Sequence, residues 1–123
     1  MEALVKDYWK AFQIQDYDLL YSLFQEDARI TWPNTKEQFD RETFCAINRQ
    51  YPGNWKETIQ HITMLDTQEW LSEVLVEGEN ISFYAISIFT IQNDKIQHIR
   101  EYWSANEEPP AWRKAYLNAR KSQ

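Results

Sequence analysis

The sequence lacks several features that mark common classes of protein. Cys45 is the only cysteine among 123 residues, so no disulfide can form within the chain and no cysteine-rich zinc motif is present. The N-terminus has no basic start followed by an apolar core, and no apolar run approaches the length of a membrane span. We therefore expect a cytoplasmic protein without a membrane segment.

Positive charge is also scarce. The chain has 13 Lys and Arg residues against 19 Asp and Glu residues, a formal net charge of -6. Because phosphate groups and anionic lipids bind basic surfaces, neither nucleic acid nor a membrane is an expected partner. His61 and His98 have no carboxylate or second histidine at metal-ligand spacing, so we expect no metal. A small molecule or another protein chain remains as the expected partner.

The apolar residues follow a helical period first and a strand period afterwards. A chain of this length suffices for one domain, so we expect a single domain over 1–123, with a core over 4–103 and a tail over 104–123. The spacing predicts helices at 2–15, 17–24, 36–51 and 109–121, and strands at 27–32, 56–65, 69–77, 81–92 and 95–103. Asp40 could instead cap a shorter third helix that begins near Arg41.

The last four expected strands are joined by short turn sequences at 66–68, 77–80 and 93–94. Connections of this length predict an antiparallel meander. Helices followed by a meander are typical of an α+β domain, in which the helices pack on one face of a curved sheet.

The last expected strand, Lys95–Trp103, carries a carboxylate on an apolar face. Because side chains alternate along a strand, Ile99, Glu101 and Trp103 share one face. A carboxylate on such a face is costly to bury unless a partner or a ligand compensates its charge. Glu101 is therefore the first candidate functional residue.

The order of the elements resembles the nuclear transport factor two superfamily, especially its SnoaL-like branch. Two stretches carry the resemblance, namely 17–33 and the hairpin 82–103, which ends in Arg-Glu-Tyr-Trp. The resemblance covers 4–103 and implies a cone-shaped curved antiparallel sheet packed against N-terminal helices, followed here by a helical tail. Relatives include isomerases, cyclases, dehydratases, epoxide hydrolases and noncatalytic adaptors, so the resemblance indicates a fold rather than a reaction.

Comparison with two catalytic relatives narrows the expected chemistry. The resemblance places Tyr8 at the catalytic tyrosine of ketosteroid isomerase, but Trp32 and Ser87 stand where that enzyme has its base and its protonated acid. Glu101 matches the carboxylate in the last strand of limonene epoxide hydrolase. The arginine and second aspartate of that hydrolase have no counterpart in 81–92. Neither reaction is expected in its known form.

The resemblance also implies which side chains face the inside of the cone. These are Trp70, Ser72, Val74, Val76, Phe83, Ala85, Ser87, Phe89, Ile99, Glu101 and Trp103. The assignment depends on the length of the turn at Asn93 and Asp94. A change of one residue there would bring Tyr84 and Ile86 inward instead.

We expect an apolar pocket in which Glu101 and Tyr8 are catalytic. The expected substrate-binding residues are Trp32, Trp70, Phe83, Ser87, Ile99 and Trp103. Burial should raise the pKa of Glu101 and suit it to proton transfer near neutral pH. The expected ligand is a small, flat, apolar organic molecule, and the expected chemistry is isomerisation, cyclisation or hydration without a cofactor.

The alternative is a structural role for the same residues. Glu101 could pair with Arg49 or accept a hydrogen bond from Tyr8, and the protein could bind a ligand or another chain without catalysis. The outer sheet face supports binding to another protein chain. An apolar patch there predicts a symmetric homodimer, its members being Leu75, Ile86, Ile88 and Tyr102.

Overall fold

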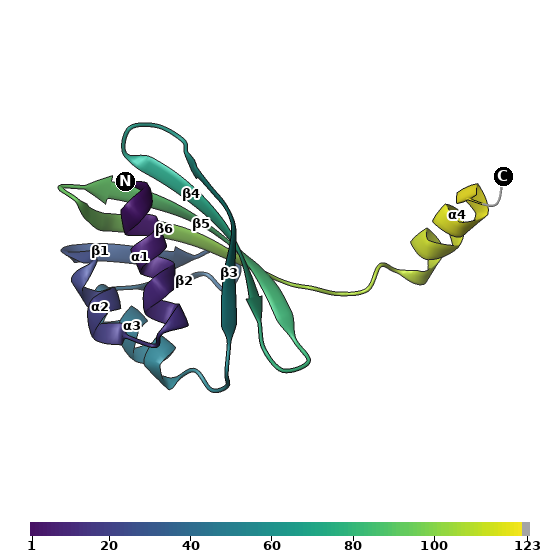
Figure 1. Ribbon diagram of the computed structural model, residues 1–123, viewed down its shortest axis with the longest axis horizontal. Helices are drawn as coiled ribbons and strands as arrows, with labels where there is room; N and C mark the ends of the chain where they lie inside the picture. The colour runs from purple at the N-terminus through teal and green to yellow at the C-terminus, as the bar shows by residue number, and fades with distance from the viewer. Residues whose placement is uncertain (122–123) are drawn as a thin grey trace.

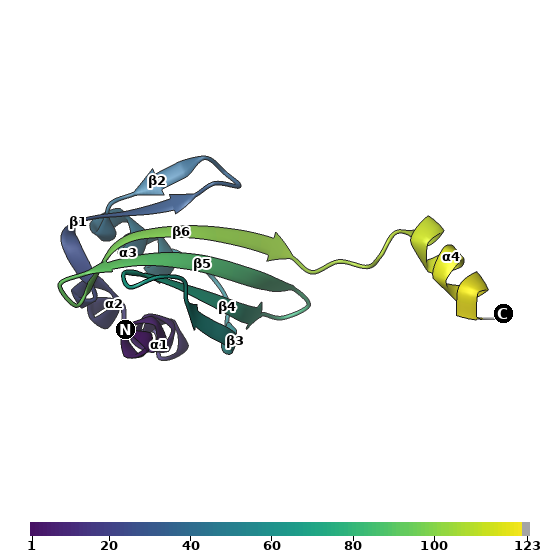
Figure 2. The same ribbon diagram turned by 90° about the horizontal axis from the view of Figure 1, so that it is seen from above.

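A curved sheet with helices on one of its faces forms the body of the protein (Figure 1, Figure 2). The computed structural model describes residues 1–121. The helices are α1 (Glu2–Gln13), α2 (Tyr17–Ser22), α3 (Arg41–Gln50) and α4 (Ala111–Lys121). The strands are β1 (Phe24–Trp32), β2 (Glu37–Phe39), β3 (Lys56–Met64), β4 (Glu69–Glu77), β5 (Ser82–Gln92) and β6 (Lys95–Ala105).

The strands lie in the order β2-β1-β6-β5-β4-β3. Strands β3 to β6 pair antiparallel with their sequence neighbours, as expected of a meander. Strand β1 instead lies parallel to β6, so the sheet is mixed. The expected α+β architecture is confirmed, with this one parallel pair added to it.

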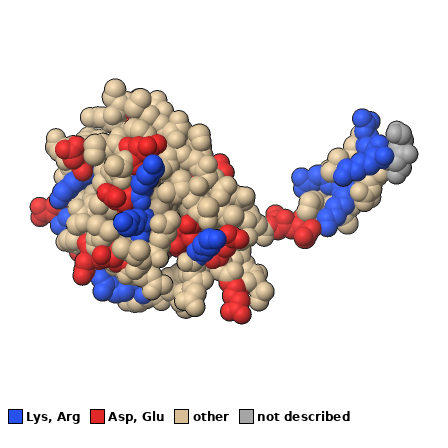
Figure 3. Space-filling model, in the orientation of Figure 1, with Lys and Arg blue, Asp and Glu red and all other residues tan. Residues whose placement is uncertain are grey.

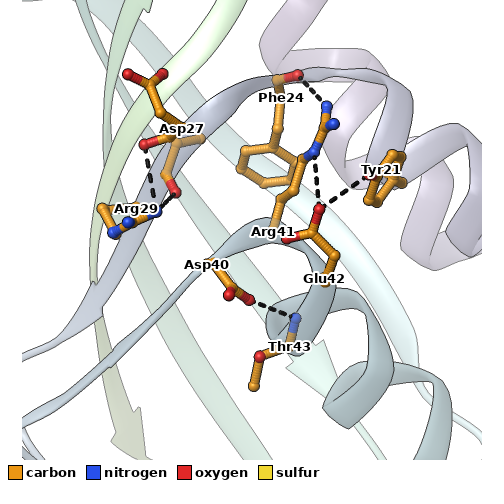
Figure 4. A network of polar contacts seen from close by, with 9 residues as sticks. Tyr21, Phe24, Asp27, Arg29, Asp40, Arg41, Glu42 and Thr43 are labelled. Carbon is orange, nitrogen blue, oxygen red and sulfur yellow. Dashed lines mark hydrogen bonds and ion pairs between the residues drawn. The ribbon is translucent and has the colours of Figure 1, made fainter.

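The main differences from the expected elements arise because tertiary pairing overrides local propensity. Helix α2 was expected to reach Phe24, but Phe24 begins β1 and pairs with Ile96 of β6. The expected helix over 36–51 is split: its first residues form the short strand β2 against β1, and α3 follows. Asp40 caps α3 by accepting a hydrogen bond from the Thr43 backbone N–H at 2.8 Å, which confirms the shorter helix (Figure 4).

Arg41, the first residue of α3, ties this helix to its neighbours (Figure 4). Its guanidinium donates to the Phe24 backbone oxygen of β1 at 3.2 Å and lies 4.0 Å from the centre of the Tyr21 ring of α2. The Tyr21 hydroxyl donates to Glu42 at 3.0 Å. These contacts hold α2 and α3 against the start of β1.

The β5–β6 hairpin sets which residues share the inner face. Asn93 and Asp94 both have positive φ, as a two-residue hairpin turn requires. If the pairing that starts at this turn continued without a bulge, Arg100 would lie opposite Ser87. A bulge at Gln97 shifts the pairing by one residue, so that Glu101 lies opposite Ser87.

The expected inner face is therefore confirmed, although the bulge that produces it was not foreseen. Its consequence is visible in Ile96 and Ile99, which are three residues apart and both fully buried. Strict alternation would put them on opposite faces. The expected inner residues are buried or half-buried, and Tyr84 lies on the exposed outer face.

Helix α4 stands apart from the body in both ribbon views (Figure 1, Figure 2). The expected tail helix is confirmed, beginning at Ala111, but none of its described residues is buried. Trp112 is 72% exposed, and Tyr116 and Leu117 are also exposed. Lysine and arginine side chains cover much of its visible surface, whereas the body mixes both charges (Figure 3).

Two further findings concern membranes and metals. No helix within residues 1–121 is long and apolar enough to cross a lipid bilayer. In the same range, no three His, Cys, Asp or Glu side chains are arranged to hold a metal ion.

Candidate functional site

Glu101 lies at the centre of a cluster of hydrogen-bond donors on the inner face of the sheet. Its side chain is 1% exposed. Oε2 accepts from the Tyr8 hydroxyl at 3.0 Å and from the Ser87 hydroxyl at 2.6 Å. Oε1 accepts from the Trp32 indole N–H at 3.2 Å and from the Trp103 indole N–H at 3.0 Å. The structure thus brings Glu101, Tyr8, Ser87 and both tryptophans together, as one polar cluster.

This cluster uses the hydrogen-bonding capacity of the Glu101 carboxylate fully. Each oxygen accepts two hydrogen bonds, which leaves no free lone pair for a ligand. Burial raises the pKa of Glu101, and the four donors oppose that rise. Burial and the neighbouring carboxylate raise the pKa of Tyr8 well above its ordinary value, so its hydroxyl keeps its proton and donates.

A cavity of about 290 Å³ opens beside this cluster. Its lining consists of Trp9, Phe12, Gln15, Tyr17, Trp32, Asn34, Thr35, Asn48, Tyr51, Gly53, Trp55, Glu57, Val76, Phe83 and Trp103. Of the expected site residues, Trp32, Phe83 and Trp103 line it. Those outside the lining are Tyr8, Trp70, Ser87, Ile99 and Glu101.

The cavity is shallower than expected because aromatic side chains fill the deep part of the cone. The Tyr8 ring packs edge-on against Phe89, with 5.1 Å between ring centres, and stacks against Phe44 at 6.5 Å. Trp32 and Trp103 both line the cavity and both donate to Glu101. These two indoles therefore lie between the cavity and the Glu101 carboxylate.

Glu57 is the acidic residue that lines the cavity, and sequence reasoning missed it. It lies near the start of β3, opposite Val76 of β4, which also lines the cavity. Glu57 Oε1 is buried and has no hydrogen-bond partner, the only side-chain atom in this condition among residues 1–121. Burial raises the pKa of Glu57 from 4.5 to about 7.

The signal for Glu57 was present in the sequence. Trp55, Glu57 and Ile59 alternate, so the carboxylate stands between two apolar residues on one strand face. This is the same pattern that singled out Glu101. The resemblance assigns no inward face to the strand at 56–65, so Glu57 was not among the predicted site residues.

No basic side chain lines the cavity around Glu57, although the Arg49 guanidinium lies 5.7 Å from the centre of the Tyr17 ring. From α1, the Gln13 side chain donates to the Glu57 backbone oxygen at 3.0 Å and not to the unpartnered Oε1. From α2, Tyr17 lines the same cavity, and its pKa is raised by burial and then by Glu57. The nearby Arg49 of α3 is outside the lining and pairs with Asp18 at 3.3 Å.

An aromatic wall runs along one side of the cavity. The centre-to-centre distances between successive rings are 5.4 Å for Tyr51–Trp55, 5.8 Å for Trp55–Phe83, 6.1 Å for Phe83–Trp103 and 6.5 Å for Trp103–Trp32. Such a wall offers flat, apolar surface to a ligand. One end of it is held by Glu101 through two indole N–H groups.

Comparisons with known proteins identify this architecture. No protein-family model matches the sequence, and no curated protein matches it either. Solved structures do match. One, a candidate ketosteroid isomerase from Kribbella flavida, has a TM-score of 0.80 and 21% identity, over 88% of this chain and 80% of the other.

A second is a nuclear transport factor two-like protein of unknown function from Burkholderia xenovorans, with a TM-score of 0.80 and 23% identity over 94% and 91% of the two chains. The chain has the nuclear transport factor two-like fold. A third such structure, from Catenulispora acidiphila, has a ketosteroid isomerase-like fold and was solved in complex with trimethylamine; the TM-score is 0.71 at 15% identity, over 82% and 85% of the chains.

Within this nuclear transport factor two-like fold, the position of Trp55 depends on a close approach by Gly78. The Trp55 indole N–H donates to the Pro52 backbone oxygen at 2.9 Å. A Cβ atom on Gly78 would lie 2.6 Å from the Trp55 ring, far inside van der Waals contact. Glycine at this position therefore allows the indole to stand beside Phe83 in the aromatic wall.

Proposed function

We propose that the chain binds a small, flat, mostly apolar molecule in the cavity and transfers a proton on it, with Glu57 as the acid/base. The observation that carries the proposal is the buried, unpartnered Glu57 oxygen in the cavity lining. A pKa of about 7 lets this carboxyl group accept and donate protons near neutral pH. Geometry and proton affinity therefore favour the same residue.

The residues predicted from the sequence take supporting roles in this proposal. Trp32, Phe83 and Trp103 hold the flat part of the ligand. Glu101 becomes a positioning residue, because its carboxylate accepts hydrogen bonds from the indole N–H groups of Trp32 and Trp103. Tyr8 completes the donor set of Glu101 and does not touch the ligand.

The reaction class is one that needs only proton movement, namely isomerisation, cyclisation or hydration without a cofactor. A positioned general acid or base contributes about 10²–10⁴-fold to the rate of such a step. The fold similarity to a candidate ketosteroid isomerase, and a small molecule bound by another neighbour, support a small-molecule site. The runner-up is ligand binding without catalysis.

Proton exchange tests the proposal without knowledge of the substrate. Flat aromatic ketones would be incubated with the protein in deuterium oxide, and loss of the protons next to the carbonyl would be followed by NMR. We expect exchange with wild type and a loss of about 10²–10⁴-fold with Glu57→Gln. Glu101→Gln should lose less, because its side-chain oxygen still accepts from both indoles.

The reverse pattern would contradict the proposal. If Glu101→Gln abolished exchange while Glu57→Gln retained it, the acid/base would be Glu101. If no ketone exchanged but ligands still quenched tryptophan fluorescence saturably, binding without catalysis would be the better account.

We also propose a symmetric homodimer through the outer sheet face. Ile86 and Ile88 are half-buried there, and Tyr84 and Tyr102 are each 39% exposed. A patch of this kind is typical of a protein interface. Light scattering at micromolar concentration should give twice the chain mass, and Ile86→Glu should give a monomer. A wild-type monomer would refute the dimer.

A further inference from the structure

The cavity contains an acidic group without any basic group to balance it. Among its lining residues, all within the described part of the chain, Glu57 is the only one with a charged side chain. The other polar side chains of the lining are neutral amides and hydroxyls. Since a carboxylate is costly to ionise when one of its oxygens is buried without a partner, the ionised cavity is complementary to a positive charge.

Aromatic rings make up more than half of the same lining. The face of an indole or phenol ring attracts a cation, and the attraction is strongest where water is excluded. Trp55 and Tyr17 line the cavity together with Glu57. The formal net charge of -6 also favours the approach of cations over anions.

We propose that the ligand of this cavity is an organic cation, a quaternary ammonium or a protonated amine that carries a flat apolar group, with its positive charge against the Glu57 carboxylate. This inference rests on the proposed function and names the ligand class of its site. The flat group lies along the wall from Trp55 to Trp103. A cavity of about 290 Å³ is at the small end of ligand sites, so the cation is small.

Other classes of ligand fit the same cavity less well. An anion would meet the Glu57 carboxylate, and no basic side chain in the lining would compensate the repulsion. A neutral ligand could donate a hydrogen bond to Glu57 but would leave its negative charge without a countercharge. Among these classes a cation supplies the positive charge that the lining lacks.

Cation binding also has a consequence for the Glu57 proton. An opposite charge at contact distance lowers the pKa of a carboxyl group, so binding near pH 7 should release a proton from the protein. The other groups that surround Glu57 do not account for such a release. Gln13 is neutral, the pKa of Tyr17 is raised above its usual value, and Arg49 is paired with Asp18.

Two aromatic probes of nearly equal shape test the inference, phenyltrimethylammonium and its uncharged counterpart tert-butylbenzene. Their affinities would be measured at pH 8 by quenching of tryptophan fluorescence. We expect wild type to prefer the cation by about tenfold or more. Glu57→Gln should abolish the preference, while Glu26→Gln, which removes an exposed charge outside the lining, should keep it.

Calorimetry on the wild type gives a second readout that needs no variant. Phenyltrimethylammonium has no proton to lose, so a binding heat that changes with the ionisation enthalpy of the buffer at pH 7 reports a proton released by the protein. Equal affinity for both probes, an unchanged preference in Glu57→Gln, or absence of proton release would each overturn the inference. The ketone-exchange experiment uses neutral compounds, so it tests the proposed proton transfer independently of the proposed ligand charge.

Discussion

Two carboxylates on the same sheet, the fully buried Glu101 and the half-buried Glu57, differ in what surrounds them. Four donors satisfy Glu101, and it does not line the cavity. Glu57 lines the cavity, and its Oε1 has no partner. Burial raises the pKa of both groups. Burial on an apolar strand face therefore marks both carboxylates as unusual, and the number of their hydrogen-bond donors separates them.

The inner face of the sheet therefore has two regions, a deep one around Glu101 and a shallow one around Glu57. The deep region around Glu101 is closed by the Tyr8 ring and by the indoles of Trp32 and Trp103. The shallow region around Glu57 is open to a ligand. In the proposed function, the hydrogen-bonded residues around Glu101 position the aromatic wall, and Glu57 exchanges the proton.

The largest expected effect is on stability at Glu101. Glu101→Leu leaves the donors of Tyr8, Ser87, Trp32 and Trp103 without an acceptor, which should cost about 3–5 kcal/mol of unfolding free energy. Glu101→Gln should cost less than half of that. Urea unfolding measures both. A Glu101→Leu protein as stable as the wild type would show that the cluster is not structural.

An intermediate effect is expected where Gly78 meets Trp55. Gly78→Ala places a Cβ at 2.6 Å from the indole ring, and overpacking of this kind costs about 1–3 kcal/mol. The displaced indole should also weaken binding of phenyltrimethylammonium. The double variant Gly78→Ala with Trp55→Phe should recover part of the stability, since the smaller ring relieves the clash. Purely additive losses would contradict the predicted contact.

The smallest expected effect is a gain in stability at Glu57. Its pKa is higher in the folded state, so the stability it contributes is fully present below about pH 4.5 and is lost as the pH rises through about 7. Glu57→Gln should therefore be more stable than wild type at pH 8, by on the order of 1 kcal/mol after allowance for partial exposure. At pH 4 the two proteins should be alike. A less stable variant at pH 8 would mean that Glu57 has a partner after all.

The sequence predicted much of the fold because its long elements have clear periods. The meander from β3 to β6 and the inward facing of Ser87 with Glu101 are confirmed. The short strand β2 was missed, since three residues carry no period and its pairing with β1 depends on tertiary structure. The bulge at Gln97 was missed for a similar reason.

The candidate site could be predicted only in part. The hydrogen bond from Tyr8 to Glu101 was among the expected alternatives, whereas Ser87, Trp32 and Trp103 were expected to contact a ligand and instead donate to Glu101. The depth of the cavity does not, because it depends on how the rings of Phe44, Phe89 and Tyr8 pack together. Glu57 carried a readable pattern, but its place in the cavity lining and its unpartnered Oε1, which distinguish it from Glu101, depend on tertiary structure.

The most direct measurement is the NMR titration of the Glu57 carboxyl carbon, assigned by its absence from Glu57→Gln. The account predicts a midpoint near pH 7 in the free protein and a lower midpoint when phenyltrimethylammonium is bound. A midpoint near the ordinary value of 4.5 in the free protein would contradict the central claim that the cavity holds an uncompensated carboxylate.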